Sequence, residues 1–406
     1  MDENTRFVQV TPPTSACSIA FGEGFTDMVS EMQNSIQVVV PDAEAARKGS
    51  FSSVGFGEEV GRRPGVRHWW RLGATWTRRV WMKAVVQGVY GSADTLRFGD
   101  IEIPVIGNDE VLVRVRAAGV DPGVWHLMTG LPYLVRLMGM GVRRPKVPVR
   151  GRDLAGVVEA VGSRVTRFRP GNEVYGVTPV GSFAEYARSR ESDLARKPAN
   201  LTLEQAAAVP VSGMTALQGL RDVGRVQPGQ HVLVIGAAGG VGSFAVQLAH
   251  AFGARVTGVC STAKTDLVRS IGADDVIDYT REEVDARGPK FDLILDTAGR
   301  RPLSLLRRAL TPGGTLAIVG GEGGDRWLGG FDRQILRAPV RSAFSHQRLR
   351  AVVAKERTED LEYLTTLIEE GKVTPVIDRT FPLSEAPEAI RYLKQGHPGG
   401  KIVVTV

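Results

Sequence analysis

The chain has 406 residues, of which 43% are hydrophobic, and a formal net charge of +7. This length and composition indicate a globular protein of two or three domains rather than a disordered one. The positive charge suits anionic ligands, but no basic run interleaved with aromatic residues falls inside the folded part, so we expect no nucleic-acid partner. No apolar run approaches about 18 residues, so no transmembrane helix is expected.

The N-terminal sequence and the cysteine usage both bear on the cellular compartment of the protein. Met1-Asp-Glu-Asn is not the cationic start of a signal peptide. The only cysteines, Cys17 and Cys260, lie far apart in different contexts. This usage argues against a disulfide framework and for a reducing compartment, so we predict a cytoplasmic protein.

Residues 1–81 differ in texture from the rest. They mix Ser, Gly and Pro without a sustained period, and then place Trp69, Trp70, Trp76 and Trp81 among arginines. A basic aromatic segment is compatible with membrane-surface contact or organelle targeting, although acidic residues such as Asp2 and Glu31 weigh against targeting. We predict a poorly ordered N-terminal extension, since Met82-Lys-Ala-Val-Val resembles a natural beginning.

A β-rich module follows. Short alternating runs separated by turn residues predict strands at 83–87, 96–103, 110–118, 156–161, 173–177 and 181–187. A helical stretch from Leu203 to Leu220 then leads into alternating strands and helices, with strands at 275–277, 291–295 and 315–319. Such alternation is typical of a doubly wound parallel sheet, an α/β fold. The last predicted strand, Lys401–Val406, should return to pair with the β-rich module.

The stretch His231–Lys264 carries the strongest motif. An apolar strand leads into the turn Gly236-Ala-Ala-Gly-Gly-Val-Gly242, which opens a helix ending near Gly253, and a second strand begins at Arg255. This is a variant of the dinucleotide fingerprint with Ala in place of the first Gly. Glycines let the backbone approach a pyrophosphate, and the helix N-terminus offers unpaired N–H groups to it. The expected cofactor contacts are Ala237, Gly239, Gly240, Val241 and Gly242.

The end of the second strand bears on which dinucleotide is bound. A free ribose 2′-hydroxyl is usually held by Asp or Glu about 20 residues after the glycines. Here the sequence reads Gly258-Val-Cys-Ser-Thr-Ala-Lys264, without a carboxylate. Ser261 and Lys264 would match a 2′-phosphate, so we predict NADPH rather than NADH. The alternative is that Lys264 is a solvated residue at a helix start.

Collinear motifs across residues 82–406 resemble those of the medium-chain dehydrogenase/reductase superfamily, in particular its zinc-free, quinone oxidoreductase-like branch. The matching segments are 117–122, 156–162, 169–175, 197–200, 207–210, 272–279, 291–299 and 371–376. The resemblance implies a GroES-like catalytic domain (82–206 and 345–406) split by a Rossmann domain (207–344), with substrate in the cleft between them. It also implies a homodimer, by analogy alone.

The resemblance also bears on zinc and catalysis. The zinc-dependent branch has His at the position of Arg152 and a catalytic Cys in the loop that here holds Asp121, so we predict no metal site. Zinc-free relatives usually have Asn at the position of Asp121 and often a tyrosine near His126. His126 is a candidate hydrogen-bond donor or proton source, or else it faces solvent or caps the backbone. A carboxylate at Asp121 would repel an oxyanion, so its expected role is to hold the loop.

Further contacts are carried over from relatives by position. Thr215 matches a threonine near the nicotinamide, and Tyr279 matches a tyrosine beside the adenosine 2′-phosphate or is an ordinary surface aromatic. Gly320 and Gly321 should border the nicotinamide ribose. The apolar residues near His126 indicate either an apolar substrate pocket or a helix packing face. These residues are Leu127, Met128, Leu131, Pro132 and Tyr133.

Together these features predict an NADPH-dependent, zinc-independent reductase that transfers hydride to a quinone or an α,β-unsaturated carbonyl. Such a site needs only to orient the cofactor and to stabilise developing negative charge. Two alternatives stay open. One is a metal-free alcohol or aldehyde dehydrogenase, and the other is a non-catalytic NADPH-binding sensor or scaffold.

Overall fold

The computed structural model describes residues 7–10, 19–22, 69–72, 75–78, 81–286, 290–320, 326–330, 338–343, 345–396 and 398–406. The chain divides into two compact units, Met1–Trp81 and Met82–Val406. In the first unit, antiparallel pairs join β1 (Phe7–Val10) to β2 (Ile19–Gly22), and β3 (Trp69–Leu72) to β4 (Thr75–Arg78). The rest of the predicted N-terminal extension lies outside the described residues, so its poor order stays a prediction.

One sheet of the second unit gathers strands from both ends of that unit. We call it the β-rich domain. Its strands are β7 (Glu110–Val120), β8 (Asp153–Val161), β9 (Glu173–Val177), β10 (Tyr186–Arg190), β11 (Leu194–Arg196), β18 (Ile377–Pro382) and β19 (Lys401–Thr405). They lie in the order β11-β9-β8-β7-β19-β18, with β10 also paired to β7. A separate pair is formed by β5 (Trp81–Val86) and β6 (Arg97–Glu102). The antiparallel pairing of β19 with β7 confirms the predicted return of the C-terminal strand.

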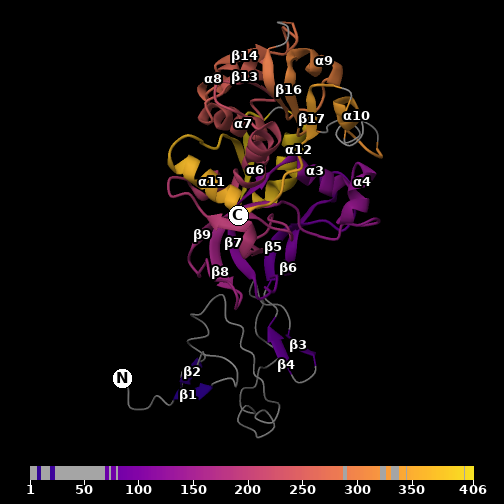
Figure 1. The fold of residues 1–406 in the computed structure, drawn as a ribbon. Helices are drawn as coiled ribbons and strands as arrows, with labels where there is room; N and C mark the ends of the chain where they lie inside the picture. The colour runs from indigo at the N-terminus through magenta and orange to yellow at the C-terminus, as the bar shows by residue number, and fades with distance from the viewer. Residues whose placement is uncertain are drawn as a thin grey trace. The chain divides into compact units, whose positions relative to one another are not determined.

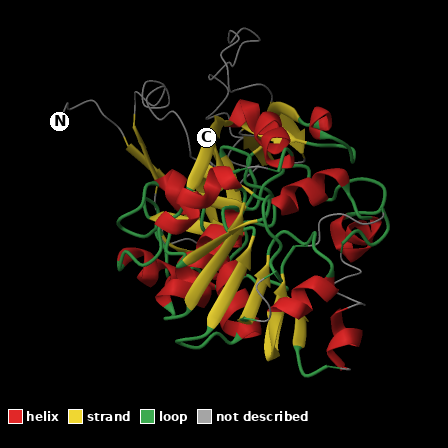
Figure 2. Cartoon of the chain, turned by 90° about the horizontal axis from the view of Figure 1, so that it is seen from above, coloured by secondary structure: helices red, strands yellow, loops and turns green. Residues whose placement is uncertain are grey.

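The middle of the chain forms a six-stranded parallel sheet, the parallel-sheet domain. Its strands are β12 (His231–Ile235), β13 (Arg255–Cys260), β14 (Asp275–Asp278), β15 (Phe291–Asp296), β16 (Leu310–Ile318) and β17 (Arg348–Ala351). Helices flank these strands (Figure 2). They include α7 (Gly240–Ala251), α8 (Thr265–Ser270), α9 (Leu303–Ala309) and α10 (Ala338–Ala343). The strand order β14-β13-β12-β15-β16-β17 reverses between β12 and β15, where doubly wound sheets bind ligands. The predicted Rossmann-type sheet inserted in a β-rich domain is confirmed.

The helical stretch predicted at 203–220 is not one helix. It is divided into α5 (Leu203–Ala207), α6 (Pro210–Gln218) and a π-helical turn, η4 (Gly219–Gly224). Thr202 and Gln205 form a capping box on α5, and Pro210, which has no N–H to donate, begins α6. The strand β17 was not predicted, because its flanking sequence lacks a clear period.

The C-terminal helices α11 (Thr358–Glu369) and α12 (Ala386–Lys394) belong to the return segment. Figure 1 shows α12 beside α3 (Pro122–Thr129), and the two helices are in contact. Helix α11 packs on α6 and on β11, so it touches both domains. None of the described helices has the length and apolar character that crossing a bilayer requires.

A buried tyrosine fastens α11 to the β-rich domain. The Tyr175 hydroxyl of β9 donates to Leu361 O at 2.7 Å and lies 2.9 Å from Thr365 Oγ1. Burial raises the pKa of this phenol. Tyr175→Phe should lower the free energy of unfolding by about 1–2 kcal/mol, because buried acceptors lose their donor. Urea unfolding measures this loss, with the exposed Tyr363→Phe on α11 as the matched control. Equal stability of the two variants would contradict the prediction.

Candidate functional site

The turn between β12 and α7 is built for close backbone approach. Gly236 has a φ of 79°, a left-handed conformation that favours glycine, and Gly239 is the N-cap of α7. A Cβ added to Gly242 would stand 2.0 Å from Gly236 O, so only glycine lets the helix pack on this turn. Ala237 and the first turn of α7, with Gly240 and Val241, complete the predicted fingerprint. The N–H groups of that turn form the anion-binding end of a 12-residue helix.

A threonine that the sequence analysis did not single out connects the turn to the next strand. Thr297 follows β15, and both its N–H and its hydroxyl donate to Ile235 O, at 3.1 and 2.7 Å. A Cβ on Gly236 would contact Thr297 Oγ1, and one on Gly320 would contact Thr297 O. The predicted Gly320 therefore lies at the same sheet edge as the glycine turn. Gly321 falls outside the described residues.

The predicted adenosine-end residues follow β13 and β14. Half-buried Ser261 begins the turn that carries Lys264, whose ammonium donates to Pro398 O at 2.8 Å. Partial burial lowers the pKa of Lys264. Tyr279 donates its N–H to Cys260 O, which places the exposed tyrosine beside Ser261. The structure therefore brings together the predicted residues Ser261, Lys264 and Tyr279 at the ends of two neighbouring strands.

A carboxylate at this end was missed because it belongs to β14 rather than to the end of β13. Asp278 accepts hydrogen bonds from the Thr262 hydroxyl and, at 3.0 and 2.7 Å, from the N–H and hydroxyl of Thr280. Arg281 lies 3.5 Å away. The bond from Thr262, and then those from Thr280, lower the pKa of Asp278. Its oxygens are thus occupied by the protein.

A buried ion pair joins the β-rich domain to the two helices at the glycine turn. Asp153, at the start of β8, is fully buried, and its Oδ2 lies 3.1 Å from Lys401 Nζ of β19. Asp153 Oδ1 accepts from Val211 N of α6 at 2.9 Å. The Lys401 side chain runs against Gly240, where an added Cβ would stand 3.0 Å from Lys401 Cδ. Burial raises the pKa of Asp153, against the opposing charge of Lys401.

Asp121 and Thr215 lie around this pair. Asp121 is buried, and its Oδ1 accepts from Gly123 N at 2.7 Å as the N-cap of α3. This is the predicted loop-holding bond. Its Oδ2 has no hydrogen-bond partner, and its charge is close enough to raise the pKa of Asp153. The buried Thr215 of α6 donates its hydroxyl to Val211 O at 2.6 Å. The N–H of the same Val211 bonds the Asp153 carboxylate.

His126 is held at the other end of α3. Its Nδ1 bonds Leu131 O at 2.7 Å, and the side chain is half-buried. Of the apolar residues near it, Met128 is fully buried in the core of the β-rich domain, which fits a packing face. Tyr133 instead packs edge-on against Trp327 at 5.3 Å, and Tyr133 N donates to Arg326 O. The segment after α3 thus contacts the segment that follows β16.

Comparison with known proteins agrees with this geometry. A family model of the alcohol dehydrogenase GroES-like domain matches residues 107–199, and one of zinc-binding dehydrogenases matches residues 271–404. The NADPH-dependent alkenal/one oxidoreductase, chloroplastic, of Arabidopsis thaliana is 35% identical over 80% of this chain and 79% of its own. The mitochondrial NAD(P)H oxidoreductase RTN4IP1 of Bos taurus is 32% identical over 86% and 94%. The quinone oxidoreductase structure from Coxiella burnetii superposes with a TM-score of 0.69 at 27% identity, over 80% and 99% of the two chains.

The chain belongs to the medium-chain dehydrogenase/reductase superfamily, in its quinone oxidoreductase-like branch. The residues at the glycine turn fit the nicotinamide dinucleotide that this superfamily implies. Gly236 and Gly242 leave room for a pyrophosphate, and the N-terminus of α7 supplies donors to it.

The zinc that other members of the superfamily hold does not fit this site. Arg152, at the position where the resemblance places the His of zinc-dependent members, forms an ion pair with Glu356. In the described part of the chain, no three His, Cys, Asp or Glu side chains are grouped so as to hold a metal ion. A guanidinium does not ligate zinc.

Gly242 offers a direct test of the fingerprint in this superfamily member. Gly242→Ala should destabilise the protein by about 1–3 kcal/mol, because its methyl group overlaps Gly236 O, and should abolish thermal stabilisation by NADPH. Gly239→Ala is the control: its nearest neighbour would be 3.3 Å away and its φ of −82° suits alanine. Differential scanning fluorimetry without cofactor should show a parent-like midpoint for Gly239→Ala only. A parent-like Gly242→Ala would refute the assigned packing.

Proposed function

We propose that this protein is an NADPH-dependent, zinc-independent reductase of α,β-unsaturated carbonyls and quinones. As a member of its branch it is an NAD(P)-dependent oxidoreductase. The observation that carries the finer proposal is a glycine turn suited to a dinucleotide together with Asp121, before α3, and Arg152, before β8, at the two positions where zinc-dependent members have zinc ligands. The names of the Arabidopsis alkenal/one and Coxiella quinone enzymes support the acceptor class.

In such a reaction, different residues of the chain would bind the cofactor and hold the elements around it in place. When bound, the reduced nicotinamide supplies the hydride for the C=C bond of an enone or the ring of a quinone, and a proton completes the product. The first turn of α7 binds the pyrophosphate, and Thr215, Thr297 and Gly320 border the nicotinamide half. The Asp153–Lys401 pair fixes this turn against the β-rich domain.

His126 is the proposed proton donor. A carbonyl only accepts hydrogen bonds, so the contact with Leu131 O places a proton on Nδ1. Donation toward a substrate would then come from Nε2 of the charged imidazolium. Asp121 acts by position: it caps α3 through Gly123 N and so holds the helix that carries His126. A carboxylate in direct contact with a developing oxyanion would oppose it.

The preference for NADPH rests on the adenosine end. Lys264 supplies a cation that Pro398 O holds in place, and Ser261 and Tyr279 stand beside it. The nearby Asp278 already accepts bonds from Thr262 and Thr280, so it is not set to receive a ribose hydroxyl. A 2′-phosphate would therefore meet more donors than acceptors here.

An acceptor panel tests the reaction. NADPH oxidation should be rapid with an alkenal or 1,4-benzoquinone and negligible with acetaldehyde, and treatment with EDTA should leave the rate unchanged. Turnover of acetaldehyde with loss of activity in EDTA would favour an alcohol or aldehyde dehydrogenase instead. Tight NADPH binding, measured calorimetrically, without turnover of any acceptor would favour a sensor or scaffold.

Lys264→Met tests the cofactor preference. Losing a charge-assisted hydrogen bond to the 2′-phosphate should raise the KM for NADPH by about tenfold or more, while the KM for NADH stays near the parent value. Arg269→Met, which removes an exposed cation of α8 near the same strand, is the matched control. An equal rise for both cofactors would show that Lys264 acts only through its bond to Pro398.

The proposal also covers the cellular compartment and the oligomeric state of the protein. Cys260 is a buried free thiol, and burial raises its pKa to about 11. We propose a reducing compartment such as the cytoplasm because the two cysteines lie far apart in the sequence, which argues against a disulfide framework. The Arabidopsis and Bos taurus relatives are named chloroplastic and mitochondrial, so cell fractionation is the deciding experiment. Homodimer formation is proposed by family analogy and is checked by sedimentation.

A further inference from the structure

Exposed apolar side chains gather on one segment after α3. It runs through the short helix α4 (Tyr133–Val135), the π-helical turn η2 (Arg136–Met140) and the loop up to Lys146. Leu137 is 69% exposed, Met140 42% and Val142 63%. Trp327, also 69% exposed, packs edge-on against Tyr133 of α4. Scattered exposed apolar residues are ordinary, but a group of this size on one surface marks an interaction site.

The backbone of this segment is firmly held, so the exposure of its side chains is a feature of the fold. Lys146 N donates to Met140 O at 3.0 Å and closes the loop. The Tyr90 hydroxyl lies 2.9 Å from Met140 O and 2.6 Å from Gly141 O. The Arg136 guanidinium stacks on the Tyr90 ring at 4.3 Å. These contacts hold the backbone of the loop in place, while the side chains of Leu137, Met140 and Val142 stay exposed.

The same loop is basic. Arg143, Arg144 and Lys146 are exposed, and within the described part of the chain none of them forms an ion pair. No Asp or Glu occurs between Asp121 and Asp153. The surface formed by Leu137, Met140, Val142 and Trp327 with these three cations is here called the 137–146 surface. It combines apolar groups with positive charge that no described carboxylate pairs.

This combination decides between possible occupants. A second copy of the chain would bring the same positive charge, on a protein of net charge +7, against it. An acidic protein surface would pair with the cations, but the aliphatic side chains would then need a matching apolar groove on that partner. The interface of an anionic bilayer satisfies both at once, since cations contact headgroups while aliphatic and Trp side chains enter the acyl boundary.

We propose that the 137–146 surface docks this protein on anionic lipid membranes. Leu137, Met140 and Val142 insert at the headgroup boundary, and Arg143, Arg144 and Lys146 contact lipid phosphates. The docking is peripheral and requires no membrane-spanning helix. It does not rest on the proposed reaction, because lipid binding is measured without cofactor or acceptor.

Co-sedimentation of the full chain with vesicles tests the proposal. Vesicles of phosphatidylcholine mixed with phosphatidylglycerol should bind the protein, vesicles of phosphatidylcholine alone should bind it far less, and salt should weaken the binding. Arg143→Glu/Arg144→Glu should weaken binding by about tenfold or more, since each cation near an anionic surface contributes about 1 kcal/mol. Leu137→Ser/Val142→Ser should weaken it about as strongly, through lost apolar burial.

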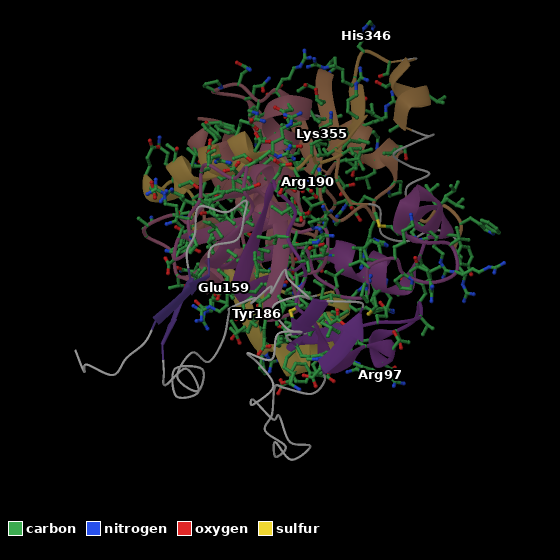
Figure 3. The ribbon with its side chains drawn as sticks, turned by 90° about the horizontal axis from the view of Figure 1, so that it is seen from below. Arg97, Glu159, Tyr186, Arg190, His346 and Lys355 are labelled. Carbon is green, nitrogen blue, oxygen red and sulfur yellow. The ribbon has the colours of Figure 1, made fainter. Side chains whose placement is uncertain are left out.

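Matched controls separate the loop from general charge and hydrophobicity. Arg97→Glu/Arg190→Glu makes the same change in charge at exposed positions of β6 and β10, labelled in Figure 3. Val105→Ser/Val353→Ser removes two equally exposed valines elsewhere. Both controls should bind as the parent does. Should the charge-reversed loop fail to fold by circular dichroism, Arg143→Gln/Arg144→Gln takes its place.

Three results would overturn the proposal. The first is absence of binding to anionic vesicles. The second is binding that the loop variants leave intact, which would place the lipid contact elsewhere, for example in the basic aromatic residues before Met82. The third is a change in oligomeric state of the loop variants in sedimentation equilibrium without lipid, which would assign the surface to self-association.

Discussion

The buried ion pair between Asp153 and Lys401 is the interaction on which the arrangement of the site depends. The two residues are 248 positions apart, and each comes from a different stretch of the β-rich domain. Burying either charge alone would cost several kcal/mol, so each residue is tolerated only because the other is present and because Val211 N bonds the carboxylate. The pair thereby ties β8 and β19 to α6, and the aliphatic part of Lys401 lies along the first turn of α7.

This arrangement connects the glycine turn to the start of α3 through the Asp153–Lys401 pair. Asp121 lies close enough to Asp153 to raise its pKa, and it caps the helix that carries His126. Asp153 and Thr215 both bond the backbone of Val211, Asp153 by accepting from its N–H and Thr215 by donating to its carbonyl oxygen. Hydride transfer requires such fixed geometry, because it depends on orientation more than on covalent chemistry from the protein.

The sequence predicted what local pattern controls. The glycine turn was predicted from its spacing and the parallel sheet from the alternation of strands and helices, while the loop-holding role of Asp121 followed from the family resemblance. Long-range partners were missed. Arg152 was considered because zinc-dependent members have His at its position, but its neighbour Asp153 forms the buried ion pair. Nothing near Lys401 in the sequence indicates that the Lys401 side chain is buried. Thr297 reaches Ile235 only because β12 and β15 pair.

The apolar residues after His126 show most clearly what periodicity cannot resolve. The sequence offered a pocket or a packing face for them, and the structure divides the stretch between burial and exposure: Met128 is in the core, while Leu137 and Val142 face outward beside three cations. Tyr90, far earlier in the chain, donates its hydroxyl to Met140 O and so holds the backbone of the exposed part. One continuous segment thus carries His126, the proposed proton donor, at one end and the 137–146 surface at the other.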